Sequence, residues 1–178
     1  MVNISDDLFG FSESKGINSK SKGDTNERKL TKVLGTWVGA EFVRVPRSGG
    51  LRWQNRMNVC GDLICTDPKI NFPFSIETKH YRKITYSLVL RKNSLIFTFW
   101  KQALNDAIVE GKLPMLFLKG NYMRDWILVM DLKDFSTNRI EPLFKGEYET
   151  NKFIVGWYFK EITKIPYTKF LKLCSTRN

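Results

Sequence analysis

Two short apolar runs, at 115–118 and 126–130, constrain the fold of this chain more than any other feature. They flank the pair Gly120-Asn121, and glycine and asparagine are typical of turns. Short, continuous apolar runs bounded by turn residues are typical of strands that are buried on both faces. The two runs therefore predict neighbouring strands in the interior of a sheet.

Helical and extended patterns alternate along the rest of the chain. One helix is expected to begin at a cap formed by Asp24 and Thr25 and to end near Gly39, and a second is expected at about 94–110, closed by Gly111. The further expected elements are strands at 41–45, 62–66, 74–79 and 153–158 and a short amphipathic helix at 167–174. This order predicts the α/β class, with a central mixed sheet flanked by helices.

Composition divides the chain into three parts. Residues 1–24 are rich in Ser, Gly, Asn, Lys and Asp and are expected to form a mobile N-terminal arm. Residues 25–137 are expected to form the core, and residues 138–178 a C-terminal extension that packs on it. Since no apolar stretch approaches the ~20 residues that a spanning helix needs, we expect no membrane partner and a cytoplasmic, intracellular protein.

The net charge of +11 favours a polyanionic partner, because a positive field attracts phosphate chains and accelerates encounter with them. The expected arm holds slightly more acidic than basic residues, so the positive charge belongs to the folded part. Nucleic acid is the first candidate. Small basic proteins also bind anionic membranes or use their charge for solubility, and those alternatives stay open on charge alone.

Chemistry is concentrated in the segment 74–79. As a strand with a period of two, it places Glu77 and Lys79 on one face, and a hairpin through the turn Asp67-Pro68 brings Asp62 alongside. Hydrolysis of a phosphodiester needs carboxylate ligands for a hard cation, a polarised water and positive charge for the transition state. Asp62, Glu77 and Lys79 supply these groups. A solvated polar strand face is the simpler alternative.

Three further residues are candidates, each with a plain structural alternative. Glu27 lies one helical turn before Leu30, near the inward face of the first expected helix, where a carboxylate needs a cation; helix capping is its alternative. Ser48 precedes two glycines in a loop that can approach phosphate or simply turn the chain. Gln102 has the default interpretation of a surface glutamine on a helix.

Taken in order, these motifs carry a resemblance over roughly residues 22–130. They are Gly23, Glu27, Arg44, Ser48-Gly49-Gly50, Gly61-Asp62, Ile76-Glu77-Thr78-Lys79 and Gln102. The chain resembles the archaeal-type Holliday junction resolvases of the PD-(D/E)xK nuclease superfamily. The resemblance implies a restriction-endonuclease-like core, cleavage of branched DNA, Mg²⁺ with Mn²⁺ as a substitute, and a homodimer.

Roles follow from the resemblance by position. Asp62 and Glu77 are expected to hold the metal, with the carbonyl of Thr78 as a further ligand and Glu27 reaching the metal directly or through water. Lys79 is expected to orient the attacking water, Ser48 to contact phosphate and Gln102 to support the site. The chain departs from the superfamily where Gly61 replaces the proline of its name, and the tail beyond residue 138 has no counterpart.

A DNA-facing surface is expected from basic side chains near these motifs, with Trp53 available for stacking. A solvated basic rim is the equal alternative. The expected surface consists of basic residues together with Ser48 and Gln102. The basic residues are Arg44, Arg47, Arg52, Arg56, Arg82, Lys83, Arg91 and Lys92.

The leading hypothesis is a Mg²⁺-dependent, structure-selective endonuclease, a Holliday junction resolvase associated with the nucleoid. The richness in Lys and Asn suits a phage or a low-GC host. The alternatives are another PD-(D/E)xK nuclease, either restriction-like or a recombination or repair exonuclease, and a non-catalytic DNA-binding subunit. A homodimer also agrees with the symmetric nicks that resolve a junction and with apolar segments at 95–99 and 153–159 that exceed what one core needs.

Overall fold

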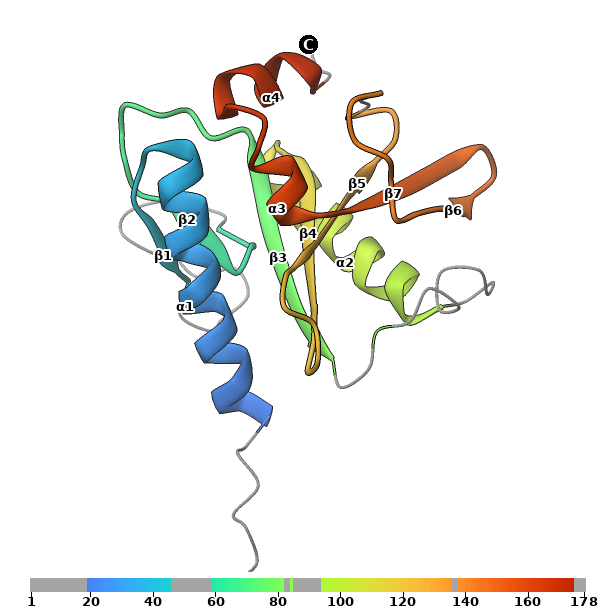
Figure 1. The fold of residues 1–178 in the computed structure, drawn as a ribbon, viewed down its shortest axis with the longest axis horizontal. Coiled ribbons are helices and arrows are strands. Elements are labelled where there is room, and N and C mark those ends of the chain that lie inside the picture. Colours follow the sequence, from blue (N-terminus) through green and yellow to red (C-terminus); the bar gives the residue numbers. More distant parts are fainter. Residues whose placement is uncertain (1–18, 46–58, 82–83, 85–93, 136–137, 175–178) are drawn as a thin grey trace, which may run out of the picture.

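The computed structural model describes residues 19–45, 59–81, 84, 94–135 and 138–174. Within them the chain forms one seven-stranded mixed sheet in the order β1-β2-β3-β4-β5-β7-β6 (Figure 1). The strands β3 and β4 are parallel, and every other neighbouring pair is antiparallel. The strands are β1 (Phe42–Arg44), β2 (Leu63–Cys65), β3 (Phe74–Tyr81), β4 (Leu113–Gly120), β5 (Ile127–Asp131), β6 (Phe144–Glu149) and β7 (Lys152–Tyr158).

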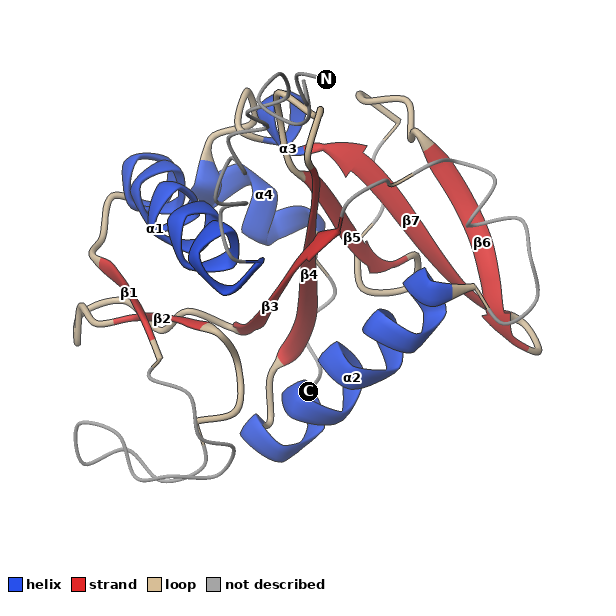
Figure 2. Cartoon of the chain, turned by 90° about the horizontal axis from the view of Figure 1, so that it is seen from below, coloured by secondary structure: helices blue, strands red, loops and turns tan. Residues whose placement is uncertain are grey.

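Helices cover both faces of the sheet (Figure 2). One face packs against α1 (Ser19–Val38), α3 (Phe159–Ile162) and α4 (Tyr167–Leu173), and the other against α2 (Leu95–Glu110). The expected strands at 115–118 and 126–130 correspond to β4 and β5. Their side chains divide between two cores, with Phe117 on the α1 side and Leu116 on the α2 side. The expected α/β class with a central mixed sheet flanked by helices is therefore confirmed.

The helix α2 is the crossover that makes β3 and β4 parallel. It is closed by Gly111, whose φ of 66° lies in the left-handed region that glycine adopts without strain. The register then sets Glu77 of β3 opposite Leu116 of β4. On the other side of β3, the antiparallel β2 places Leu63 opposite Ile76, as the expected hairpin requires.

Some element boundaries and elements differ from the expectation. The helix α1 begins at Ser19, before the expected cap at Asp24 and Thr25, so residues 19–23 of the expected arm are helical. The strand β6 was not expected, because only Gly146 and Tyr148 are buried in a segment that otherwise carries exposed charges. The short α3 was not expected either. Since β7 pairs with β5, the sheet continues across the expected boundary at 137/138.

Within the described ranges, no helix combines the length and apolar character needed to cross a bilayer.

Candidate active site

Asp62 is fixed against the edge of β3 by backbone and side-chain hydrogen bonds. Its own N–H donates to the carbonyl of Ile76 at 2.7 Å. Its Oδ2 accepts from the backbone N–H of Thr78 at 2.8 Å and from the Thr78 hydroxyl at 2.9 Å. The predicted hairpin thus brings Asp62 beside the segment that carries Glu77 and Lys79.

Glu77 is the buried carboxylate of the cluster, with an exposed fraction of 2%. Its Oε1 accepts hydrogen bonds from Lys79 Nζ and, at 2.8 Å, from Gln102 Nε2. Gln102 is exposed, as a surface glutamine is expected to be, and its amide in addition reaches from α2 to the carboxylate on β3. Glu77, Lys79 and Gln102 form one hydrogen-bonded group between sheet and helix.

Burial and the nearby negative charge of Asp62 raise the pKa of Glu77 to about 7, although the hydrogen bond and charge of Lys79 act in the opposite direction. Within the described part of the chain, neither Oδ1 of Asp62 nor Oε2 of Glu77 takes part in a hydrogen bond. Each carboxylate thus keeps one oxygen for a ligand. A bound cation would offset both causes of the raised pKa.

Glu110 is a component of the site that the sequence interpretation missed. From the C-terminal end of α2, its Oε1 accepts hydrogen bonds from the backbone N–H groups of Cys60, at 2.8 Å, and Gly61, at 2.9 Å. Its Oε2 pairs with Lys112 at 2.7 Å. Burial alone would raise the pKa of Glu110, but the hydrogen bonds from Lys112, Gly61 and Cys60 outweigh burial and lower it. Glu110 therefore ties α2 to the backbone immediately before Asp62.

Asp106 is the second missed residue. Gln102, Asp106 and Glu110 recur every four residues, which places them on one stripe of α2. Burial, followed by the negative charges of Asp62 and Glu110, raises the pKa of Asp106, and the charge of Lys79 lowers it. Asp106 thus lies within electrostatic reach of both Asp62 and Lys79. Its spacing of four residues from both Gln102 and Glu110 was the available sequence signal.

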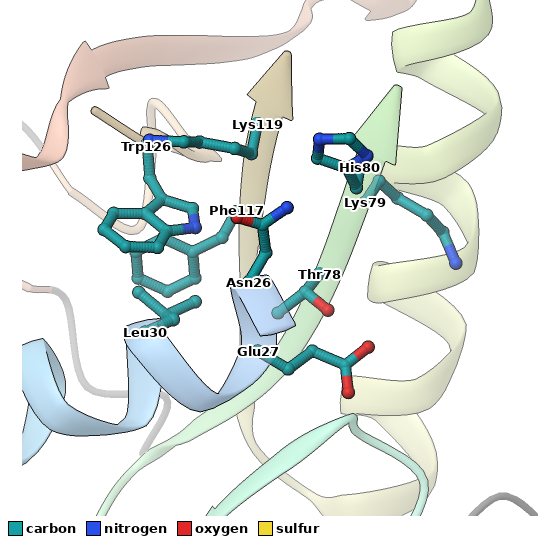
Figure 3. A pocket seen from close by; sticks show the side chains of 9 residues that line it. All are labelled: Asn26, Glu27, Leu30, Thr78, Lys79, His80, Phe117, Lys119 and Trp126. Atoms are coloured by element: carbon teal, nitrogen blue, oxygen red, sulfur yellow. The ribbon is translucent and has the colours of Figure 1, made fainter. Parts of the chain in front are cut away.

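Glu27 approaches the cluster from α1 but is bound to another residue. It lines a small pocket together with Thr78 and Lys79 (Figure 3). Its Oε2 accepts a hydrogen bond from Nε of Arg44, while Nη2 of Arg44 pairs with Asp24 at 2.7 Å. Among the described residues, no three carboxylate, histidine or cysteine side chains are grouped so that they could hold a metal ion. Glu27 therefore neutralises Arg44 here and does not join Asp62 and Glu77.

The other expected site residues cannot be placed. They lie outside the described residues, and their expected roles remain predictions: Arg47, Ser48, Arg52, Trp53, Arg56, Arg82, Lys83, Arg91 and Lys92.

Comparison with known proteins identifies a nuclease family for this chain. A profile of the family described as "Phage putative PDDEXK endonuclease" matches residues 18–174. Among solved structures, the chain is similar to the Archaeoglobus fulgidus protein Hjc, a Holliday junction resolvase from an archaeal hyperthermophile. The two share 18% identity over 79% of this chain and 99% of that one, with a TM-score of 0.41. No curated protein sequence matches the chain.

Proposed function

The chain belongs to the phage PD-(D/E)xK endonuclease family, and we propose that it is a metal-dependent endonuclease that cleaves DNA near branch points, as a Holliday junction resolvase does. One observation carries the proposal: Asp62, the buried Glu77 and Lys79 meet at one edge of β3. Two carboxylates and an ammonium group in this arrangement have the chemistry of phosphodiester hydrolysis.

Asp62 and Glu77 are the proposed ligands of a divalent cation, Mg²⁺, for which Mn²⁺ can substitute. The donor set fits this ion, because Mg²⁺ prefers oxygen ligands and is commonly held by one or two carboxylates together with water. When bound, the cation supplies a polarised water and stabilises negative charge on the phosphate. Oδ1 of Asp62 and Oε2 of Glu77, which accept no hydrogen bond from the residues that the structure describes, support this assignment.

Lys79 is the proposed partner of the attacking water and of the charge that develops on the phosphate. Its ammonium group contacts Glu77 and lies 5.9 Å from the ring centroid of Phe99. These two contacts hold the ammonium group in position. Gln102 holds the Glu77 carboxylate in orientation through its 2.8 Å hydrogen bond. Water attacks the phosphorus and the bond to the 3′ oxygen breaks, leaving a 5′-phosphate and a 3′-hydroxyl.

The remaining roles are proposed by position. The carbonyl of Thr78 is a further metal ligand, and Ser48 contacts the phosphate next to the scissile bond. Glu27 reaches the metal directly or through water, which requires it to exchange its contact with Arg44 for one with the cation. Arg44 is then available to a DNA phosphate, the role expected from the sequence.

Branched DNA is the proposed substrate and a homodimer the proposed assembly. A chain of 178 residues with a net charge of +11 suits recognition of DNA shape and backbone. The apolar segments that we expected at a dimer interface do not support the dimer, because Ile96, Phe97 and Ile154 are buried in the protein's own core. Symmetric nicking of a junction remains the physical reason to propose a dimer.

The test compares nicking of a synthetic four-way junction, a matched linear duplex and a single strand, with Mg²⁺ or with EDTA. Asp62→Asn removes a proposed ligand charge and should abolish cleavage. Asp67→Asn is the matched control, since Asp67 lies in the turn between β2 and β3, where its side chain accepts a hydrogen bond from Lys69 N. This variant should cleave like the wild type.

Each outcome separates the hypotheses. Mg²⁺-dependent cuts near the branch point, lost in Asp62→Asn alone, support a resolvase. Equal cutting of linear duplex indicates another nuclease of the family. Tight DNA binding without cleavage of any substrate indicates a non-catalytic DNA-binding subunit. Monomers alone at micromolar concentration in equilibrium sedimentation would contradict the proposed dimer.

A further inference from the structure

A basic hollow adjoins the small pocket that Glu27, Thr78 and Lys79 line. It has a volume of about 660 Å³ and lies between the first turns of α1 and the turn that joins β4 to β5. Figure 1 shows that turn at the far end of β3 and β4, beside the start of α1. The positive side chains that line it are Lys29 of α1, Lys119 of β4 and Arg124 of the turn. No residue of the expected DNA-facing surface is among them.

Three cations of the hollow have no carboxylate partner within the part of the chain that the structure describes. There Lys29, Lys119 and Arg124 form no salt bridge, whereas Arg44, Lys79 and four further lysines do. Asp125 attracts Lys119, but its Oδ2 already accepts a hydrogen bond from the N–H of Lys160. The hollow therefore keeps an excess of positive charge that an anion can neutralise.

Lys119 is held in a position that favours anion binding. Its ammonium group lies 4.4 Å from the ring centroid of Trp126. Burial lowers the pKa of Lys119, and the like charge of Lys29 lowers it further. An anion between Lys29 and Lys119 would offset the repulsion, and a phosphate oxygen is a suitable acceptor for both ammonium groups.

The hollow is continuous with the small pocket that Glu27, Thr78 and Lys79 line (Figure 3). Both are lined by Asn26, His80, Lys119 and Trp126. Thr78 and His80 point to the same face of β3, and their separation of two residues corresponds to about 7 Å at ~3.3 Å per residue. Thr78 holds the carboxylate of Asp62 through its backbone N–H and its hydroxyl. A strand with its scissile phosphate beside Asp62 can therefore extend into the hollow.

We propose that this hollow binds the phosphate backbone of the cleaved DNA strand a few nucleotides from the scissile bond, with Lys29, Lys119 and Arg124 as its phosphate contacts. The proposal rests on the proposed function and adds the path of the substrate. Tyr122, with an exposed fraction of 92%, stands on the same turn and offers a ring on which an unpaired base near a branch point can stack.

The test measures DNA binding in EDTA, so that it does not depend on cleavage. The probe is a fluorescein-labelled linear duplex, and anisotropy gives Kd over a series of salt concentrations. The double variant Lys29→Ala/Arg124→Ala removes two exposed charges from the hollow. Two lost phosphate contacts should lower the slope of log Kd against log salt by about 2 and weaken binding roughly tenfold at low salt.

The matched control is Lys145→Ala/Lys152→Ala, which removes two exposed charges from the β6–β7 hairpin at the β6 edge of the sheet. It should keep the wild-type slope, and Lys29→Arg/Arg124→Lys should restore it. An equal decrease in both alanine doubles, an unchanged slope in the hollow variant, or a wild type that binds no DNA would each overturn the proposal. A decrease confined to the hollow variant in a protein that cleaves nothing would refute the nuclease and retain the hollow.

Discussion

The backbone N–H of Gly61 donates a 2.9 Å hydrogen bond to the carboxylate of Glu110, 49 residues further along the chain. Gly61 immediately precedes Asp62 and stands where the superfamily's name has proline. A proline has no N–H to donate, so this link between α2 and the start of β2 depends on the departure from the motif. The departure is therefore a structural feature of the site.

Gly61 also permits a close approach of two backbone segments. A Cβ atom at this position would lie 2.8 Å from the carbonyl oxygen of Ile76 and 3.1 Å from its nitrogen. Because these are backbone atoms of β3, they cannot move aside as a flexible side chain would. The glycine thus sets the distance between Asp62 and the strand that carries Glu77.

The first prediction is that Gly61→Pro destabilises the protein, although this substitution introduces the proline that the superfamily's name contains. Gly61→Ala should cost about 2 kcal/mol because the added methyl group forces the two backbone segments apart. Gly61→Pro should cost about 4 kcal/mol, since it adds the loss of the hydrogen bond to Glu110. Urea unfolding of both variants gives the free energies. A proline variant as stable as the wild type would contradict this account.

The second prediction concerns Glu110 itself. Glu110→Ala leaves the N–H groups of Cys60 and Gly61 without their acceptor and should cost about 3 kcal/mol, whereas Glu110→Gln keeps an acceptor and should cost about 1 kcal/mol. Cleavage should fall more in the alanine variant than its stability alone explains, because Asp62 loses its anchor.

The lowered pKa of Glu110 also predicts how its contribution to the stability of the protein changes with pH. Since its pKa is lowered by folding, its contribution to stability is present above the unfolded pKa of 4.5 and is lost as pH falls through the folded pKa. Glu110→Gln should therefore lose less stability than the wild type on acidification. The control is Glu149→Gln, which removes an exposed carboxylate that also pairs with a lysine and should leave the unfolding transition unchanged.

The chemistry of β3 could be predicted from sequence because it depends on local rules. A period of two and one hairpin turn were enough to bring Asp62, Glu77 and Lys79 together. The sheet interior followed from the apolar runs at β4 and β5. These inferences require only neighbours along the chain and one strand pairing, for which residue type is a sufficient guide.

The polar stripe of α2 could not be recognised in the same way. The partners of Gln102 and Glu110 lie 25 and 49 or more residues away on β3 and before β2, so their roles depend on how the crossover packs. The early start of α1 and the edge strand β6 were missed for a related reason. Both are polar segments whose structure comes from their neighbours and not from local apolar periodicity.

The third prediction is that the buried carboxylate of Glu77 makes the metal-free protein less stable as pH rises. Folding raises the pKa of Glu77 from 4.5 to about 7, so the unfolded chain ionises first as pH rises between these values. At 1.36 kcal/mol per pKa unit, the metal-free protein should lose about 3 kcal/mol between pH 4.5 and 7. Glu77→Gln should lose much less over this range, which thermal unfolding in EDTA measures.

Mg²⁺ provides the internal control for Glu77. If Asp62 and Glu77 bind the cation, Mg²⁺ should raise the Tm of the wild type most above pH 7, where Glu77 is ionised, and should have little effect on the Tm of Glu77→Gln. An equal rise in both proteins would show that the cation binds elsewhere.

The fourth prediction is that Asp106 contributes to the raised pKa of Glu77, after burial and the charge of Asp62. The negative charge of Asp106 raises the pKa of Glu77, so Asp106→Asn should lower it and shift the acid limb of the cleavage profile to lower pH. The same variant should move the pH midpoint of metal-free stability in the same direction, a readout that needs no catalysis. Asp67→Asn removes a carboxylate from a turn and should move neither curve. A loss of activity at all pH values with both midpoints unchanged would instead make Asp106 a ligand or substrate contact, because a group acting only through its charge on Glu77 must move the midpoint.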